Sequence, residues 1–467
     1  MVRVPSAAVA LAAFVAAPSF AQQPAPPAPV LVDPRIAALR DDALEHDRYA
    51  WEITEGLTTE VGQRLAGSEA EARARRWAVA KLRALGFQNI RVDEFPVENT
   101  LRGRESAEIL APFPQSMAVT ALGNSGLTGP EGVSGQVVGF GSIDELRAAP
   151  DSAVRGKIVF IDHHMPANQD GSGYGQFGAP RRQGPTIASR KGALALVIRS
   201  IGTDHNRTPH AGVMTFEDGV APIPAGALSV PDAEQLARIL KRGKPVSLRL
   251  VLQGRHFKGV SGNVLAEVPG RDPSLPPVLV GGHLDSWDLG TGAIDDASGV
   301  AIAAAAAKRI MDAGQPLRTI RVVWFGSEEI GLFGGQDYAK RYGKQPHYAL
   351  AESDFGADRI YGVDFKFGDA RKGEALKIGA ALAPLGIVTG AFDKADGSDI
   401  GPLIEAGQPA IALSQDGTRY FDVHHTANDT LDKIDPAQLR QNVAAWTAML
   451  AILAGPITPE PKRGRRR

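Results

Sequence analysis

The sequence contains no cysteine. Disulfide bonds are therefore excluded, and so is every metal site built on thiolates. Any metal that this chain binds must be held by imidazole nitrogens and carboxylate oxygens, a donor set that suits zinc and also accommodates manganese or cobalt. Stability has to come from a hydrophobic core and from any bound metal.

An excess of charge of one sign is also lacking. The 51 Lys and Arg residues nearly cancel the 52 Asp and Glu residues. Nucleic acids and anionic membrane surfaces attract proteins with clustered positive charge, so this balance argues against either partner. The sequence therefore directs attention to a small-molecule or peptide ligand.

Long apolar runs are scarce. The first 21 residues combine an early arginine, a short apolar stretch, and small residues at Ser19 and Ala21, a pattern typical of a secretory signal peptide cleaved after Ala21. This run is short for a membrane span, and no later run is long enough to cross a bilayer. We therefore expect an exported protein, periplasmic or secreted, with no membrane span in the mature chain.

A chain of 467 residues has room for two domains or one large one. Residues 22–34 form a Pro-rich linker, and residues 457–467 a basic, solvated tail. Residues 35–131 are expected to open as a helix over 35–58, a second helix over 69–85 with Ser68 as its cap, and a strand over 89–97. Strands alternate with helices over 255–456 and end in a helix with Asp435 as its cap and Pro436 at its first position, which predicts a mainly parallel mixed sheet sandwiched by helices. Between them, residues 132–254 show short apolar strands and brief helical pieces, so we expect an α/β catalytic domain interrupted by a β-rich insert.

The most informative stretch is 278–299, VLVGGHLDSWDLGTGAIDDASG. An apolar run predicts a buried strand, and the Ala-rich segment beyond it predicts a helix. Polar residues between a strand end and a helix start lie at the carboxyl edge of a parallel sheet, where open α/β folds bind their ligands. Four such residues stand here: His283, Asp285, Asp295 and Asp296.

Three further apolar strands are followed by acidic residues or imidazoles. They are Glu328 and Glu329 in WFGSEE, Asp354 in ALAESDFG, and His424 and His425, with Asp429 nearby, in FDVHHTANDT. The neighbours Glu328 and Glu329 cannot point the same way, so one is suited to bind metal while the other acts as a base. The alternative is a solvated pair at a helix start, favoured by the helix dipole.

The charges are consistent with two divalent ions. Asp295, Glu329 and Asp354 supply three negative charges against four positive ones, and a bridging hydroxide would complete neutrality. A single ion would leave surplus carboxylates repelling one another in a partly dry crevice. The sequence therefore predicts a two-metal site in which one carboxylate bridges the ions.

The fragments GGHLDSWDLGTGAIDDASG, WFGSEEIGLFG, ESDFG and HHTANDT resemble, in order and spacing, the co-catalytic two-zinc aminopeptidase family. The likeness extends to RLAGS, RGKIVF and TPHAG, and so covers nearly the whole chain after the linker. It implies that the insert is a protease-associated domain, that the Asp295–Asp296 peptide bond is cis, and that the protein forms a homodimer. It also implies a role for each site residue: His283 and Asp354 on one zinc, Glu329 and His425 on the other, Asp295 bridging both, Glu328 as general base, and Asp285 orienting His283.

Within that family, the closest likeness implies hydrolysis of unblocked dipeptides or short peptides. Two other activities stay open on the same fold, namely an aminopeptidase acting on longer peptides and a single-zinc glutaminyl cyclase. A non-catalytic peptide-binding protein is a further alternative, although such a protein would be expected to have lost ligands or the base. Substrate contacts are expected from four residues, for which packing roles are equally consistent with the sequence: His424, Tyr420, Arg419 and His210.

Overall fold

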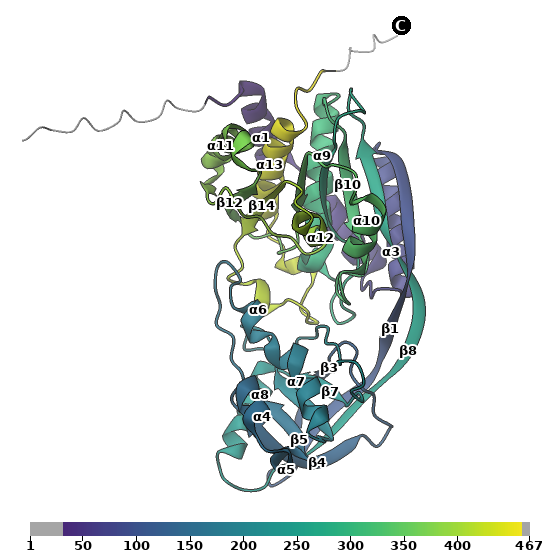
Figure 1. Ribbon diagram of the computed structural model, residues 1–467, viewed down its shortest axis with the longest axis vertical. Coiled ribbons are helices and arrows are strands. Elements are labelled where there is room, and N and C mark those ends of the chain that lie inside the picture. The colour runs from purple at the N-terminus through teal and green to yellow at the C-terminus, as the bar shows by residue number, and fades with distance from the viewer. Residues whose placement is uncertain (1–30, 460–467) are drawn as a thin grey trace, which may run out of the picture.

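The computed structural model describes residues 31–459 as two lobes, one above the other in Figure 1. The predicted signal peptide, most of the Pro-rich linker and most of the basic tail lie outside these residues. Among the described residues, no helix is both long and apolar enough to span a membrane.

The upper lobe is built on a mixed sheet with helices on both faces (Figure 1). Strands β9, β10, β11 and β14 run parallel to one another, whereas β8 and β12 pair antiparallel at the two sides. This agrees with the expected mixed sheet. In spatial order the strands are β13 (Val388–Thr389), β12 (Ile360–Lys366), β14 (Ala410–Gln415), β11 (Ala349–Glu352), β9 (Val278–His283), β10 (Ile320–Phe325), β8 (Ser247–Val268) and β1 (Gln88–Ala111).

The helices of the upper lobe follow the sequence signals that predict them. Ser68 caps the third helix by accepting a hydrogen bond from the Glu71 N–H, and Asp435 caps the last helix, with Pro436 at its first position. The helices are α1 (Pro34–His46), α2 (Tyr49–Gly56), α3 (Glu69–Ala84), α9 (Ser298–Ala313), α10 (Phe333–Tyr342), α11 (Lys372–Leu382), α12 (Gly401–Glu405) and α13 (Pro436–Leu453).

The Ala-rich helix α9 lies at the centre of this lobe. It packs against strand β9 on one side and against α2 and α13 on the other, and its alanines from Ala301 to Ala307 are fully buried. Small side chains allow this close approach of backbones. Because α9 begins directly after Asp295 and Asp296, the packing of this helix fixes the position of both carboxyl groups.

The lower lobe continues the same sheet. Strands β1 and β8 extend from one lobe into the other (Figure 1), and β4 pairs with the lower part of β8. The lobe contains the strands β2 (Gln115–Met117), β3 (Val119–Ala121), β4 (Val133–Phe140), β5 (Ile158–Ile161), β6 (Ala195–Arg199) and β7 (Ala225–Leu228), and the helices α4 (Ile143–Ala148), α5 (Asp151–Val154), α6 (Tyr174–Phe177), α7 (Ala179–Arg190) and α8 (Val230–Leu240).

Helices are longer in this lobe than the sequence suggests. Helix α7 contains Pro180, Gly184 and Pro185, a composition that predicts a loop. It forms nevertheless, because the two prolines and the glycine lie buried in the lobe, where tertiary packing outweighs propensity. The lower lobe is therefore a layered α/β unit with its own hydrophobic core.

Candidate metal centre

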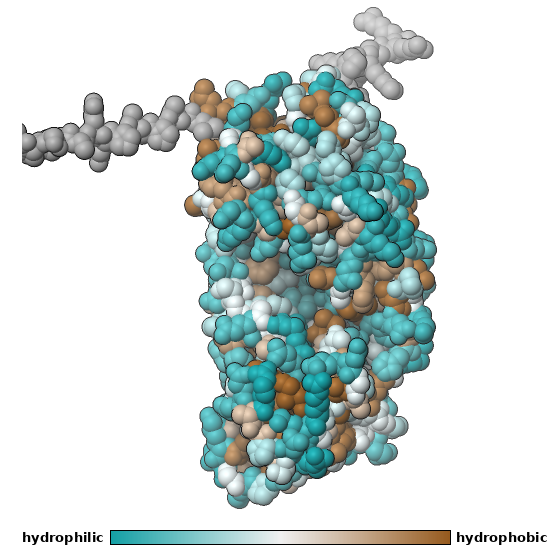
Figure 2. Space-filling view, in the orientation of Figure 1, coloured by the Kyte–Doolittle hydropathy of each residue, from teal (hydrophilic) through white to brown (hydrophobic). Residues whose placement is uncertain are grey.

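Four parallel strands bring the predicted site residues to one edge of the sheet. Strand β9 ends at His283, and β10, β11 and β14 end shortly before Glu328, Asp354 and His424. The carboxyl ends of parallel strands meet at the same edge, so segments more than 140 residues apart converge there. The surface is hollowed between the two lobes (Figure 2).

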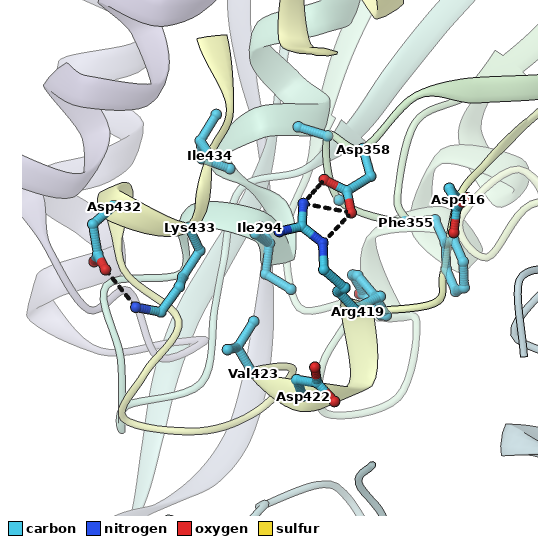
Figure 3. Close-up of a pocket in the computed structure, with 13 residues that line it drawn as sticks. Ile294, Phe355, Asp358, Asp416, Arg419, Asp422, Val423, Asp432, Lys433 and Ile434 are labelled. Atoms are coloured by element: carbon cyan, nitrogen blue, oxygen red, sulfur yellow. Dashed lines mark hydrogen bonds and ion pairs between the residues drawn. The ribbon is translucent and has the colours of Figure 1, made fainter. Parts of the chain in front are cut away.

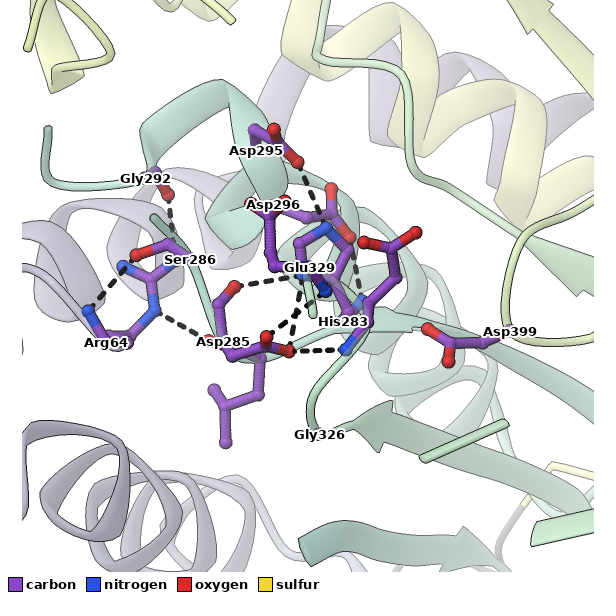
Figure 4. A network of polar contacts seen from close by, with 12 residues as sticks. Arg64, His283, Asp285, Ser286, Gly292, Asp295, Asp296, Gly326, Glu329 and Asp399 are labelled. Carbon is purple, nitrogen blue, oxygen red and sulfur yellow. Dashed lines mark hydrogen bonds and ion pairs between the residues drawn. The ribbon is translucent and has the colours of Figure 1, made fainter. Parts of the chain in front are cut away.

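Asp295 lies at the centre of this cluster. Its Oδ1 is 3.0 Å from Nε2 of His283, and its Oδ2 is 3.2 Å from Nε2 of His425. Each of these imidazoles also has a second carboxylate within reach: Asp354 Oδ1 is 3.3 Å from His283 Nε2, and Glu329 Oε2 is 2.9 Å from His425 Nε2. The five predicted ligands therefore form two histidine–carboxylate pairs, one on each oxygen of Asp295. Figure 4 shows Asp295 with His283 and Glu329.

The chemistry of this cluster fits divalent cations. Within the described residues, Asp295 Oδ2 and Glu329 Oε1 are buried and form no hydrogen bond. Burial, followed by the nearby charge of Asp295, raises the pKa of Glu329 to about 7, and burial raises the pKa of Glu328 well above its ordinary value. Buried carboxylates that repel one another are stabilised by positive charge, and nitrogen and oxygen donors without sulfur suit zinc.

Asp296 lies in the same cluster but is engaged by the backbone. Its carboxylate accepts hydrogen bonds from the N–H groups of His283 and Gly299, both at 3.0 Å. A Cβ on Gly282 or Gly299 would lie within 2.3 Å of this carboxylate, which explains why both neighbours are glycine. The peptide bond between Asp295 and Asp296 is cis, as the family resemblance implies.

Asp285 organises the Glu328–Glu329 loop as well as His283. Its carboxylate accepts hydrogen bonds from the backbone N–H groups of Glu328 (3.1 Å) and Glu329 (3.4 Å). Its main-chain carbonyl oxygen, rather than its side chain, lies 2.9 Å from Nδ1 of His283, whereas the carboxylate is 3.7 Å away. One buried residue thus fixes both loops that carry predicted site residues.

Two further residues hold the loop that leads to Asp295. The fully buried guanidinium of Arg64 donates to the main-chain carbonyls of Leu284 (2.7 Å), Thr291 (2.6 Å) and Gly292 (2.9 Å) (Figure 4). Asp429 accepts from the N–H groups of Ala293 and Ile294, both at 2.7 Å, and burial raises its pKa to about 7. Sequence reasoning missed Arg64, because its partners are carbonyl groups about 220 residues away and no side-chain pattern marks them.

The two adjacent histidines occupy different positions. His424 stacks on His425 with 3.5 Å between ring centroids, and its Nε2 is 3.4 Å from Asp295 Oδ2. Among the described residues, His425 forms an ion pair with Glu329 and His424 does not. The geometry therefore favours His425 as the partner of Glu329.

The other three residues expected to contact substrate lie in different surroundings. Tyr420 is buried, and its ring lies between Phe355 and His424, 4.5 and 4.9 Å away between centroids. Arg419 is 61% exposed and pairs with Asp358 at 2.7 Å, lining a cavity of about 200 Å³ beside the centre (Figure 3). His210 is buried with both ring nitrogens engaged by the protein, so the expectation that it contacts substrate is wrong.

Comparison with known proteins gives consistent matches. The profile of "Peptidase family M28" matches residues 263–450, the stretch that holds every predicted ligand. Carboxypeptidase Q from Mus musculus and from Homo sapiens is 34% identical over 402 residues, which is 85% of this chain and 84% of the relative. These matches confirm the family resemblance drawn from the motifs.

Solved structures agree with the sequence matches. A peptidase M28 precursor from Shewanella amazonensis has 44% identity and a TM-score of 0.87, covering 92% of this chain and 98% of its own. An aminopeptidase from Aneurinibacillus sp. strain AM-1 has 22% identity and a TM-score of 0.62, covering 91% and 98%. The second likeness shows a shared fold.

Proposed function

Because this chain belongs to peptidase family M28, we propose that it is an exported di-zinc metallopeptidase that hydrolyses unblocked dipeptides or short peptides, with Glu328 as general base. One observation carries the proposal. Asp295 presents one oxygen to the pair His283 and Asp354 and the other to the pair His425 and Glu329. A carboxylate shared in this way is what two neighbouring cations require.

The proposed roles follow from these contacts. His283 and Asp354 would hold one zinc, Glu329 and His425 the other, and Asp295 both. When bound, the two ions would polarise the scissile carbonyl and lower the pKa of a bound water molecule.

The remaining steps belong to side chains of this chain. Glu328 accepts the proton of the attacking water and delivers it to the leaving amine. Its position is fixed by Asp285, which accepts a hydrogen bond from the Glu328 backbone N–H. Glu328 is partly exposed, whereas Glu329 is buried.

Metal content and dipeptide turnover, measured together before and after chelation, test the proposal. Purified protein is expected to hold two zinc ions per chain, to cleave dipeptides, and to lose and regain both properties when zinc is removed and restored. Manganese or cobalt is expected to substitute in the reconstitution. Fully loaded protein that never cleaves an amide bond would leave a peptide-binding role instead.

A substrate panel separates the alternatives. Free dipeptides, tripeptides, longer peptides and peptides with an amino-terminal glutamine are compared at equal concentration. Relatives that match most of this chain bear the name carboxypeptidase Q, which supports a peptidase rather than a cyclase. Faster cleavage of longer peptides from the amino terminus would indicate an aminopeptidase. Cyclisation of the amino-terminal glutamine would indicate a glutaminyl cyclase.

Three further features belong to the proposal. The lower lobe corresponds to a protease-associated domain, the chain is cleaved near Ala21 on export, and the mature protein is a homodimer. Amino-terminal sequencing of protein from a periplasmic or culture fraction tests cleavage, and light scattering of the same sample tests the dimer.

A further inference from the structure

The loop 202–212 of the lower lobe lies against the segment that carries His425. The Thr203 N–H donates to the Phe421 carbonyl (3.1 Å), and the Ala211 N–H donates to the His425 carbonyl (2.9 Å). The Thr203 hydroxyl also donates to Asp422 at 2.7 Å. The segment leading to His425 is therefore held along its length by the other lobe.

The ring of His425 is itself tied to the lower lobe. Its Nε2 faces Asp295 and Glu329, and its Nδ1 lies 3.3 Å from the carbonyl oxygen of Ala211. Because a carbonyl oxygen only accepts, Nδ1 carries a proton, so Nε2 is the nitrogen whose lone pair a metal would use once Nε2 has lost its own proton. The contact to Ala211 thus sets both the orientation and the tautomer that a metal ligand needs.

His210 completes this junction from the lower lobe. Its Nδ1 is 2.7 Å from the His424 carbonyl oxygen, and its Nε2 is 2.7 Å from Asp204 Oδ1. The side chains of His210 and Asp204 are only 1% and 2% exposed. A carbonyl and a carboxylate both accept, so both ring nitrogens donate, and the ring forms a rigid link between Asp204 and the His424–His425 backbone.

We propose that His210 and Asp204 are a positioning pair that holds the His424–His425 backbone in place, so that the lower lobe sets the zinc affinity of the His425 site. The inference rests on the proposed metal centre. His425 has φ = +60°, a conformation that residues with a side chain adopt uncommonly, so contacts from outside its own segment are needed to maintain it. Partners of metal-bound imidazoles commonly change metal affinity about 10- to 100-fold.

Gly202 provides independent support for this role of the ring. A Cβ at this position would lie 2.2 Å from His210 Nε2 and 2.3 Å from its Cε1. The ring therefore fits only because residue 202 has no side chain. Gly202→Ala displaces the His210 ring without removing either hydrogen-bonding residue. This variant therefore tests the position of the ring separately from its hydrogen-bonding groups.

The test measures zinc affinity directly, by competition with a chromophoric chelator on the full chain. His210→Leu is expected to lower the zinc affinity of one site by about 10- to 100-fold and to leave the affinity of the other site near the parental value. Gly202→Ala is expected to act in the same direction. His210→Asn is expected to recover much of the loss, because its amide nitrogen can stand where Nδ1 stands. The matched control is His205→Leu, an exposed histidine of the same loop, for which parental affinity is expected.

The outcomes are separable. Parental zinc affinity in both His210→Leu and Gly202→Ala would overturn the inference, even if the apo variants melted at lower temperature, since that result describes a structural role only. An equal loss in His205→Leu would also overturn it. If His210→Leu does not fold, His210→Asn and Gly202→Ala decide. A parent chain that binds no zinc would instead contradict the proposed function, and this inference, which rests on it, would be contradicted as well.

Discussion

Glu328 and Glu329 are adjacent carboxylates with different surroundings. Glu329 is buried and lies 2.9 Å from His425, whereas Glu328 is partly exposed and its side chain forms no hydrogen bond within residues 31–459. Both backbone N–H groups are held by Asp285. The loop thus directs one carboxylate to the candidate metal centre and leaves the other without a hydrogen-bond partner from the described residues, which suits the general base that we propose.

Glu328→Gln should separate chemistry from metal binding. The amide keeps the shape of the side chain but cannot accept a proton, so turnover of dipeptides is expected to fall by roughly 10²- to 10⁴-fold. Zinc content should stay at the parental level because the proposed ligands are untouched. Steady-state kinetics and metal analysis on one preparation check both statements. Parental turnover in the variant would show that another group is the base.

Asp295→Ala should release both ions. Asp295 contacts each histidine of the centre through a different oxygen, so its removal affects both sides. Asp354→Asn is the matched comparison, because Asp354 contacts only His283 among the two histidines, and it should loosen one ion. Equilibrium dialysis followed by metal analysis gives the stoichiometry. Two retained ions in Asp295→Ala would contradict the shared role of this carboxylate.

At the scale of single residues, the sequence predicts those that follow apolar strands. His283, Asp295 and Asp354 were identified because strand ends and polar residues are readable locally. Arg64 and Asp204 were not, and His210 was expected to contact substrate instead, since these roles depend on carbonyl groups brought close only by the fold. Contacts made through the backbone leave no pattern in the side chains.

Among the elements, α9 depends on its small residues. Ala304→Leu should destabilise the protein by about 1–3 kcal/mol, because a fully buried alanine in a packed helix has no space for three more carbons. Ala313→Leu is the control at the end of the same helix, where the side chain borders an open groove of about 640 Å³. Urea denaturation of both variants measures the difference, and equal stability would show that α9 is loosely packed.

The link between α10 and β11 should make stability depend on pH. His347 lies between Tyr338 and Gln408, at 3.0 and 2.7 Å, and burial lowers its pKa to about 4 from an ordinary 6.5. The unfolded chain therefore takes up the proton more readily, and the stability conferred by neutral His347 is lost as pH falls from 6.5 toward 4. The loss is about 1.4 kcal/mol per pH unit.

His347→Gln isolates this effect, because other titrating groups are shared by both proteins. The stability difference between parent and variant should shrink by roughly 2 kcal/mol between pH 7 and pH 5. Urea unfolding at the two pH values gives this difference. A constant difference across the range would mean that His347 takes up its proton at the same pH in the folded and the unfolded protein.

Element boundaries were predictable where caps and periodicity agree. The helix expected over 69–85 is observed as α3 (Glu69–Ala84), and the capped last helix is found as expected. The strand expected over 89–97 runs on as β1 to Ala111, because its pairing with β8 continues into the lower lobe. The helix expected over 35–58 is broken at Asp47, whose side chain accepts from the Ala50 N–H and so starts a second helix.

At the scale of the whole molecule, the lobes are joined by two kinds of connection. The first is continuous, through β1 and β8, and the second consists of contacts between loops, among them the contact between loop 202–212 and residues 421–425. The change in character along the sequence indicated an insert, but not the two long strands that join it to the upper lobe. The second could not be predicted, because it joins segments more than 200 residues apart through backbone hydrogen bonds.

This second connection predicts that zinc at one lobe protects amides in the other. Binding of a ligand to the folded state raises the free energy of local opening around it, and the amides of Thr203 and Ala211 donate to the very segment that carries His425. Hydrogen exchange in peptides covering 202–212 should therefore slow by about tenfold or more on zinc loading. Helix α8 (Val230–Leu240), in the same lobe but away from the junction, should exchange at an unchanged rate. If zinc slowed exchange only in residues 283–296 and 424–430, zinc binding would stabilise the metal centre without stabilising the loop of the lower lobe that contacts it.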